Sequence, residues 1–329
     1  MSRTPEFRDY AGVRTVVLAA SGFIGRWVAR ALTEAGAELH LVVRSAPMGE
    51  PVLAAYGVRG TVHEQDLTDL AAVRQLLHRI QPVIVFNAAG YGVDPEEKQA
   101  GDERLAGLLN EQLPACAAEG LVTVPAPGWT GRRLVHLGSV YEYGNIGGHL
   151  EEHSVPAPTG LYGRSKLGGT RRLTQACETA SLSGLTARIC QIYGPGEHPG
   201  RLLPCLLEAR GVTDSLILTA GTQKKDFTYA EDVAEGLLRL GVTVGPPGEV
   251  VNLATGRLTA VRDFALMAAH VLRLDPELLR FEKPLPDNEL GHEELAVGRL
   301  RRLTGWTPGT TVAEGVRKTA EFLDRAGHR

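Results

Sequence analysis

The chain of 329 residues contains few cysteines, few lysines and no long apolar run. Its four cysteines show neither a C-x-x-C pair nor regular spacing, so we interpret them as reduced side chains that pack within helices and strands: Cys116, Cys177, Cys190 and Cys205. No apolar stretch approaches the length that crosses a bilayer, and the amino-terminal stretch MSRTPEFRDYAG is polar. We therefore expect a cytoplasmic protein without a membrane partner.

An excess of charge of one sign is also lacking. The 35 basic and 38 acidic residues are scattered and leave a formal net charge of −3, so we expect no nucleic-acid partner. The ten histidines show no metal-ligand spacing, and we expect no metal site. What is present, 43% hydrophobic and 22% charged residues, is typical of a globular protein.

Short β-branched segments alternate with helical ones along the first half of the chain. Strand-like runs at 15–20, 38–43 and 82–90 are separated by amphipathic stretches, which is typical of a parallel sheet with crossover helices. We therefore predict an α/β fold, a Rossmann-like doubly wound parallel sheet with a smaller carboxy-terminal substrate-binding α/β domain.

The alternation weakens after Gly194, where prolines become frequent. We assign residues 12–193 to the dinucleotide-binding domain and residues 194–329 mainly to the substrate-binding domain. Later segments, such as 225–256, are expected to return to the first domain. Thr311 is expected to cap the final helix.

The segment AASGFIG (19–25) joins the first predicted strand to the first predicted helix. Small residues there let the backbone approach a pyrophosphate, and amides at the helix amino terminus bind its charge. Ala19 stands where the usual fingerprint has its first glycine. We predict that this turn contacts a dinucleotide through Ala19, Ser21, Gly22, Phe23, Ile24 and Gly25.

The end of the second strand, VVRSAP (42–47), lacks the acid that holds the adenosine ribose of NAD. Arg44 and Ser45 suit a 2′-phosphate instead, because guanidinium pairs well with phosphate oxygens. NADP(H) is therefore favoured, and NAD(H) remains possible. Asp66 would accept a hydrogen bond from adenine or cap the following helix. Further candidates for cofactor contacts are Leu67, Ala88 and Ala89.

The sequence YGRSK (162–166) places Tyr162 and Lys166 four residues apart, on one face of a helix. An ammonium near a phenol lowers its pKa, so we expect Tyr162 to exchange a proton with a carbonyl or alcohol oxygen near neutral pH. Upstream, Ser139 follows a strand and would hydrogen-bond the same oxygen.

Together these motifs resemble the extended short-chain dehydrogenase/reductase family, and within it the enzymes that act on nucleotide-activated sugars. The resemblance covers nearly the whole chain. Besides the glycine turn and the Tyr162–Lys166 pair, it includes FNAAG (86–90), Asn110, ICQIYGPGEHPG (189–200), KDFTYAEDVA (225–234), VVNLATG (250–256) and LRRLTGWTP (300–308). It implies that Tyr162 is the acid/base, that Lys166 also holds the nicotinamide ribose, and that Ser139 steadies the reacting oxygen.

The resemblance also implies a site for a nucleoside diphosphate. Gln191, Arg201 and Lys225 occupy the matching positions, with Gln191 where the family commonly has Asn and Lys225 where Arg is usual. Two of the three supply the positive charge that a diphosphate requires. We therefore predict these residues as the substrate-binding set.

Related 4,6-dehydratases carry acidic residues just after the serine, where this chain has Val140 and Tyr141, and Glu142 is expected to point elsewhere. The sequence thus favours an NADPH-dependent reductase of a nucleoside-diphosphate 4-keto-6-deoxyhexose. Alternatives are a 4-epimerase with tightly bound NAD, an NADPH ketoreductase of a non-sugar secondary metabolite, and a non-enzymatic cofactor-sensing protein.

The family resemblance also suggests a homodimer formed by two long helices per subunit, near residues 100–119 and 160–182. Apolar residues on the first helix would face a partner or lie in the core: Leu105, Leu108, Leu109, Leu113 and Ala117.

Overall fold

The computed structural model describes residues 7–92, 97, 100–211, 214–285 and 291–327. In that part of the chain, seven parallel strands form one sheet in the order β11-β7-β5-β4-β1-β2-β3. The strand order reverses between β1 and β4, as in a doubly wound dinucleotide fold, which confirms the predicted fold class. The strands are β1 (Arg14–Leu18), β2 (Glu38–Val43), β3 (Thr61–Glu64), β4 (Ile84–Asn87), β5 (Leu134–Ser139), β7 (Gly184–Ile189) and β11 (Glu249–Leu253).

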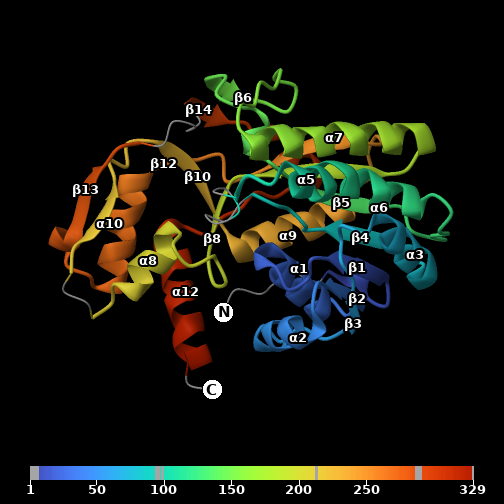
Figure 1. The fold of residues 1–329 in the computed structure, drawn as a ribbon, viewed down its shortest axis with the longest axis horizontal. Coiled ribbons are helices and arrows are strands. Elements are labelled where there is room, and N and C mark those ends of the chain that lie inside the picture. Colours follow the sequence, from blue (N-terminus) through green and yellow to red (C-terminus); the bar gives the residue numbers. More distant parts are fainter. Residues whose placement is uncertain (1–6, 93–96, 98–99, 212–213, 286–290, 328–329) are drawn as a thin grey trace.

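Helices cover both faces of this sheet (Figure 1). One hydrophobic core lies under α1 (Phe23–Glu34), α2 (Ala46–Ala55), α9 (Ala230–Gly241) and α11 (Gly298–Thr304). The opposite core lies under α3 (Leu70–Ile80), α6 (Leu113–Leu121) and α7 (Leu161–Ala180). A short helix α5 (Glu103–Ala106) and a π-helical segment η2 (Gly107–Gln112) lead into α6.

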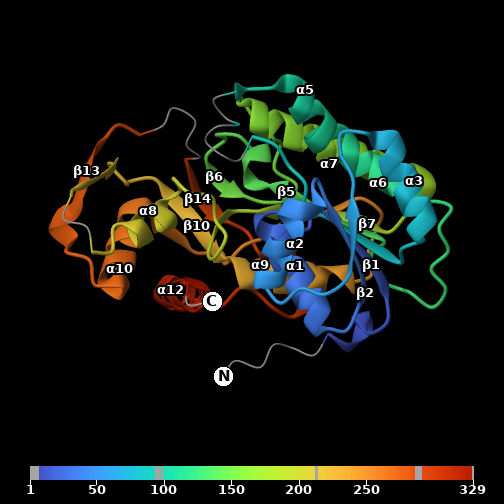
Figure 2. The same cartoon turned by 60° about the horizontal axis from the view of Figure 1, so that its bottom comes forward.

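A second region packs around its own core beside the large sheet (Figures 1 and 2). Its helices are α8 (Leu202–Glu208), α10 (Val261–Leu272) and α12 (Val312–Gly327), and Thr311 caps α12 by accepting from the Glu314 amide at 3.2 Å, as expected. The smaller sheets, as far as the described residues show, are β12-β10-β8, β13-β9 and β14-β6. Their strands are β6 (Gly148–Leu150), β8 (Gln191–Tyr193), β9 (Leu216–Thr219), β10 (Lys224–Tyr229), β12 (Leu258–Ala260), β13 (Leu279–Lys283) and β14 (His292–Leu295).

Three one-turn helices complete the described elements: η1 (Arg8–Tyr10), η3 (Val140–Glu142) and η4 (Pro276–Leu278). Within the segment 225–256, α9 and β11 pack with the large sheet, whereas β10 pairs with β8 and β12. The domain boundaries proposed from the sequence remain a prediction.

The apolar stripe expected at a dimer interface is partly core. Leu113 and Ala117 are fully buried against α3 and α7 within the protomer, so for these two the core alternative holds. Leu105, Leu108 and Leu109 are half-buried. The homodimer itself remains a prediction.

The four cysteines are free thiols, as expected. Cys116 and Cys177 are buried in helices α6 and α7, and Cys205 is half-buried in α8. Cys190 was expected inside a strand, but it lies between β7 and β8 because the chain passes there from the large sheet to a small one. No helix among the described residues is long and apolar enough to cross a membrane.

Candidate active site

A cavity of about 1520 Å³ lies at the carboxyl ends of the central strands and extends to the second region. The large sheet contributes the segments that follow β1, β4 and β5, and the far wall comes from residues next to β8, α8 and β10. Twelve of the residues predicted from sequence line it together: Ala19, Gly22, Phe23, Ile24, Ala88, Ala89, Ser139, Tyr162, Lys166, Gln191, Arg201 and Lys225. Five others, Ser21, Gly25, Arg44, Asp66 and Leu67, do not line it.

The turn between β1 and α1 is very tight. The Gly22 amide donates to the Ala19 carbonyl at 3.0 Å, and a Cβ on Gly25 would lie 2.1 Å from the same oxygen. Ala19 itself has a φ of +57°, a left-handed conformation that favours glycine. Such a compact backbone turn at the amino terminus of α1 suits the binding of a dinucleotide pyrophosphate.

Arg26, on the first turn of α1, supports this segment from outside the predicted set. Its guanidinium donates to the carbonyls of Ser21, at 2.8 Å, and Gly22, at 3.0 Å. Ser21 therefore contributes its carbonyl to the turn rather than a side chain to the cavity. The sequence reasoning missed Arg26, although its position four residues after Gly22 was a usable signal.

Arg44 lies exposed just after β2, two residues beyond Val42, which pairs with Leu18 at the end of β1. Asp66 accepts from the amide and the hydroxyl of Thr68, both at 2.8 Å, and these bonds, with Arg44 contributing, lower its pKa. The amino-terminal cap of α3 is Asp69 rather than Asp66. Roles of Arg44, Asp66 and Leu67 toward a cofactor remain predictions.

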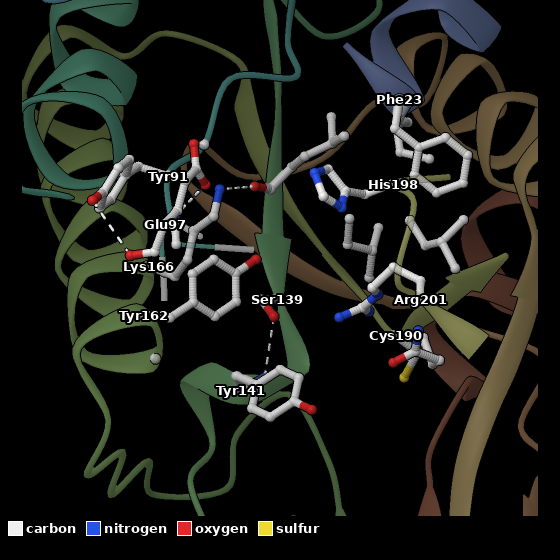
Figure 3. A pocket seen from close by; sticks show the side chains of 18 of the residues that line it. Phe23, Tyr91, Glu97, Ser139, Tyr141, Tyr162, Lys166, Cys190, His198 and Arg201 are labelled. Carbon is white, nitrogen blue, oxygen red and sulfur yellow. Dashed lines mark hydrogen bonds between the residues drawn. The ribbon is translucent and has the colours of Figure 1, made fainter. Parts of the chain in front are cut away.

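The candidate acid–base group consists of Ser139 at the end of β5 and of Tyr162 and Lys166 on α7 (Figure 3). Lys166 Nζ donates to the carbonyls of Leu137 at 2.9 Å and Ala89 at 3.4 Å. Burial lowers the pKa of Lys166 to about 8. The Lys166 ammonium is therefore fixed between the ends of β4 and β5.

Burial also raises the pKa of Tyr162 to about 12, although a hydrogen bond with Ser139 opposes this shift. The expectation that Lys166 brings the phenol close to neutral is wrong for this structure, because desolvation outweighs every favourable charge. Tyr162 is consequently a protonated phenol at neutral pH, which is the form that donates a proton.

Glu142 lies under this group and does not line the cavity. It is fully buried, and its carboxylate accepts from the Ser139 amide at 2.8 Å, from Thr170 at 2.9 Å and from Arg188 at 2.9 Å. As expected, it points away from the position where a dehydratase acid would stand. Asn110 in η2 links the Tyr91 backbone to Ser165 of α7, with each bond at 2.9 Å.

The opposite wall carries the predicted substrate-binding residues. Arg201 immediately precedes α8, and Lys225 on β10 donates to the Tyr141 hydroxyl at 3.2 Å. The Tyr141 ring in turn packs edge-on against Tyr162, with 6.0 Å between ring centroids. These contacts of Tyr141 were not predicted, because the residues that it meets lie far away in the sequence.

Other cavity residues outside the predicted set include Glu97, Glu197 and Cys190. Glu97 Oε2 accepts from the Gly92 amide at 2.8 Å and thereby fixes the backbone at Gly92. Glu197 was not predicted, although the acid in GPGEHPG was a usable signal. No group of three or more potential metal ligands occurs among the described residues.

The fold, the glycine turn and the acid–base group define an NAD(P)-dependent oxidoreductase of the extended short-chain dehydrogenase/reductase type. The chain belongs to the NAD dependent epimerase/dehydratase family, whose model matches residues 15–254. Membership of this family confirms the resemblance seen in the sequence, and the non-enzymatic alternative is not supported.

Curated relatives cover almost the whole chain. A dTDP-6-deoxy-L-talose 4-dehydrogenase (NAD(P)(+)) from Kitasatospora kifunensis is 32% identical over 94% of this chain and 95% of its own length. A probable dTDP-4,6-dihydroxy-2-methyloxan-3-one 4-ketoreductase from Streptomyces antibioticus is 29% identical over 89% and 92%. A solved structure of a DesIV double mutant, a dTDP-glucose 4,6-dehydratase from Streptomyces venezuelae with NAD bound, shares the fold with a TM-score of 0.82, at 21% identity over 95% and 97%.

Proposed function

We propose that this enzyme reduces the keto group of a nucleoside-diphosphate 4-keto-6-deoxyhexose with NADPH. The observation that carries the proposal is one cavity that joins Tyr162 and Ser139 to the cationic side chains Arg201 and Lys225. Relatives named as a 4-dehydrogenase and a 4-ketoreductase of dTDP-linked sugars support it. Val140 and Tyr141, in place of acids, favour reduction over dehydration.

The residues of the chain supply the proton and its placement. A bound nicotinamide would supply the hydride. As the carbonyl π bond breaks, Tyr162 donates its phenolic proton to the ketone oxygen, and Ser139 stabilises the charge that develops there. The raised pKa of Tyr162 keeps this proton in place before the reaction. Lys166, held between Leu137 and Ala89, supplies a fixed positive charge behind the phenol.

The dinucleotide would be held by the turn at Ala19–Gly25 and by Lys166, with Arg44 facing the 2′-phosphate of NADP(H). Arg44 is exposed at the strand end next to β1. We therefore favour NADPH and keep NADH as a possible cofactor. Substrate contacts are assigned to Gln191, Arg201 and Lys225.

The direct test mixes purified enzyme with a dTDP-4-keto-6-deoxyhexose and NADPH, and follows the loss of NADPH absorbance and the product by NMR. The expected result is a 6-deoxyhexose reduced at C4, with Tyr162→Phe as the inactive control. Retained NAD, together with inversion at C4 of a dTDP-6-deoxyhexose that carries a C4 hydroxyl, without added NADPH, would instead indicate the 4-epimerase. Reduction of a ketone without a diphosphate, unaffected by Arg201→Ala and Lys225→Ala, would indicate the non-sugar ketoreductase.

A further inference from the structure

Glu197 is an acidic side chain in the cavity that the proposed reaction does not use. It lies in the loop between β8 and α8, and its side chain is only 4% exposed. Oε1 lies 3.8 Å from Nε of Arg201. Oε2 is covered by protein and receives no hydrogen bond from the residues that the structure describes.

Few groups near Glu197 favour its ionised form. Arg201 of α8 and the Gly194 backbone oppose the effect of burial, but burial prevails and raises the pKa of Glu197 to about 8. From the same helix, Cys205 contributes a neutral thiol whose pKa is raised, mainly by burial. Arg26 of α1 borders the loop at Gly196. Glu197 is therefore predominantly neutral at pH 7 and becomes charged slightly above it.

The Arg201 guanidinium would interact with both the Glu197 carboxylate and the substrate diphosphate. It projects from the wall of the cavity toward the side that carries Ser139 and Tyr162 (Figure 3). When Glu197 is ionised, its charge neutralises that of Arg201 and repels any anion bound to it. When Glu197 is protonated, the full positive charge of Arg201 faces the cavity.

We propose that a nucleoside diphosphate binds beside Arg201 only while Glu197 carries a proton. This inference rests on the proposed function, which places the diphosphate at Arg201. Binding above neutral pH then takes up one proton, because the ionised enzyme must be protonated before the anion enters. Glu197 thus acts as a pH-dependent determinant of substrate affinity.

The inference predicts a steep loss of affinity in alkaline solution. With a pKa of about 8 in the free enzyme and no binding to the ionised form, the Kd for dTDP should rise about 25-fold between about pH 7.5 and pH 9.5. In Glu197→Gln, the part of the affinity loss that depends on Glu197 should vanish. The pH dependence that remains should come from lysines that both proteins share.

Isothermal titration calorimetry with dTDP, on the wild type, Glu197→Gln and Glu208→Gln, tests this. Titrations in two buffers of different ionisation enthalpy give the number of protons taken up on binding. The wild type alone therefore already tests whether dTDP binding is coupled to proton uptake. Glu208 is exposed on α8 and serves as the matched control, which should behave as the wild type does. Circular dichroism and a thermal melt establish that each variant is folded.

The expected result is proton uptake approaching one near pH 9 for the wild type, and none attributable to Glu197 in Glu197→Gln. Equal pH dependence in both proteins, or wild-type affinity that does not change with pH, would overturn this inference and leave the proposed function intact. If dTDP fails to bind at every pH, the diphosphate site itself is wrong, and the inference falls with it.

Discussion

Replacing Lys166 with methionine measures how much stability the buried ammonium costs. Lys166 is 3% exposed, and burial lowers its pKa from 10.5 to about 8. A shift of this size corresponds to about 3 kcal/mol at about 1.4 kcal/mol for each pH unit. Methionine has a similar length and no charge, so it removes this penalty. The loss of the hydrogen bonds to the Leu137 and Ala89 carbonyls destabilises the variant by about 1 kcal/mol. The variant should be about 2 kcal/mol more stable near pH 7.

The sign of the pH dependence follows from the lowered pKa. Below about pH 8 the ammonium is charged in both the folded and the unfolded chain, so the full penalty acts on the folded state. As pH rises toward 10.5 the unfolded lysine also loses its proton, and the penalty disappears. The advantage of Lys166→Met over the wild type should therefore shrink by about 2 kcal/mol between about pH 7 and pH 9.5.

Urea unfolding of the wild type and the variant at both pH values provides the measurement. Lys224→Met is the control, because Lys224 is exposed on β10 and should show no such pH-dependent difference. Activity of Lys166→Met should fall at least about 100-fold, since the acid–base group loses its cation. If the variant is less stable than the wild type by the same amount at both pH values, the buried charge is not what limits stability at this site.

The remaining predictions concern the acid, the cofactor and the turn. Tyr162→Phe should lower kcat about 100- to 10,000-fold without changing NADPH affinity in a fluorescence titration, and retained activity would exclude Tyr162 as the proton donor. Arg44→Ala should weaken NADPH about 10- to 100-fold and leave NADH unchanged, so an equal effect on both would contradict a contact with the 2′-phosphate. Ala19→Gly should raise the free energy of unfolding by about 0.5–1 kcal/mol, because glycine adopts the left-handed conformation without strain. Gly25→Ala should lower the free energy of unfolding by about 2 kcal/mol or more. Thermal melts that rank these two variants in the opposite order would refute this account of the turn.

The large sheet and the acid–base pair were predictable because their signals are local. Consecutive β-branched residues predict buried strands, and a spacing of four places Tyr162 and Lys166 on one helical face. The glycines at 22 and 25 likewise report a tight turn within a few residues. Each of these inferences needs only a short window of sequence.

What the sequence could not predict depends on contacts between distant segments. The bond from Lys225 to Tyr141 joins residues 84 positions apart, and it places an aromatic ring beside Tyr162. The pKa of Tyr162 was misjudged because spacing reveals a neighbouring cation but not the depth of burial. For a related reason the sequence left open whether Leu113 and Ala117 lie in the core or face a partner, since an apolar stripe does not distinguish the two.

Glu142 joins three pieces of the catalytic half that would otherwise be independent. Its single carboxylate bonds the end of β5 at Ser139, the side of α7 at Thr170, and β7 at Arg188. Glu142 thereby ties Ser139 to the helix that carries Tyr162, whereas Arg201 and Lys225 lie at the start of α8 and on β10. Under the proposed function, changes in α8 and β10 alone would alter which sugar is accepted, while Ser139 and Tyr162 keep their places.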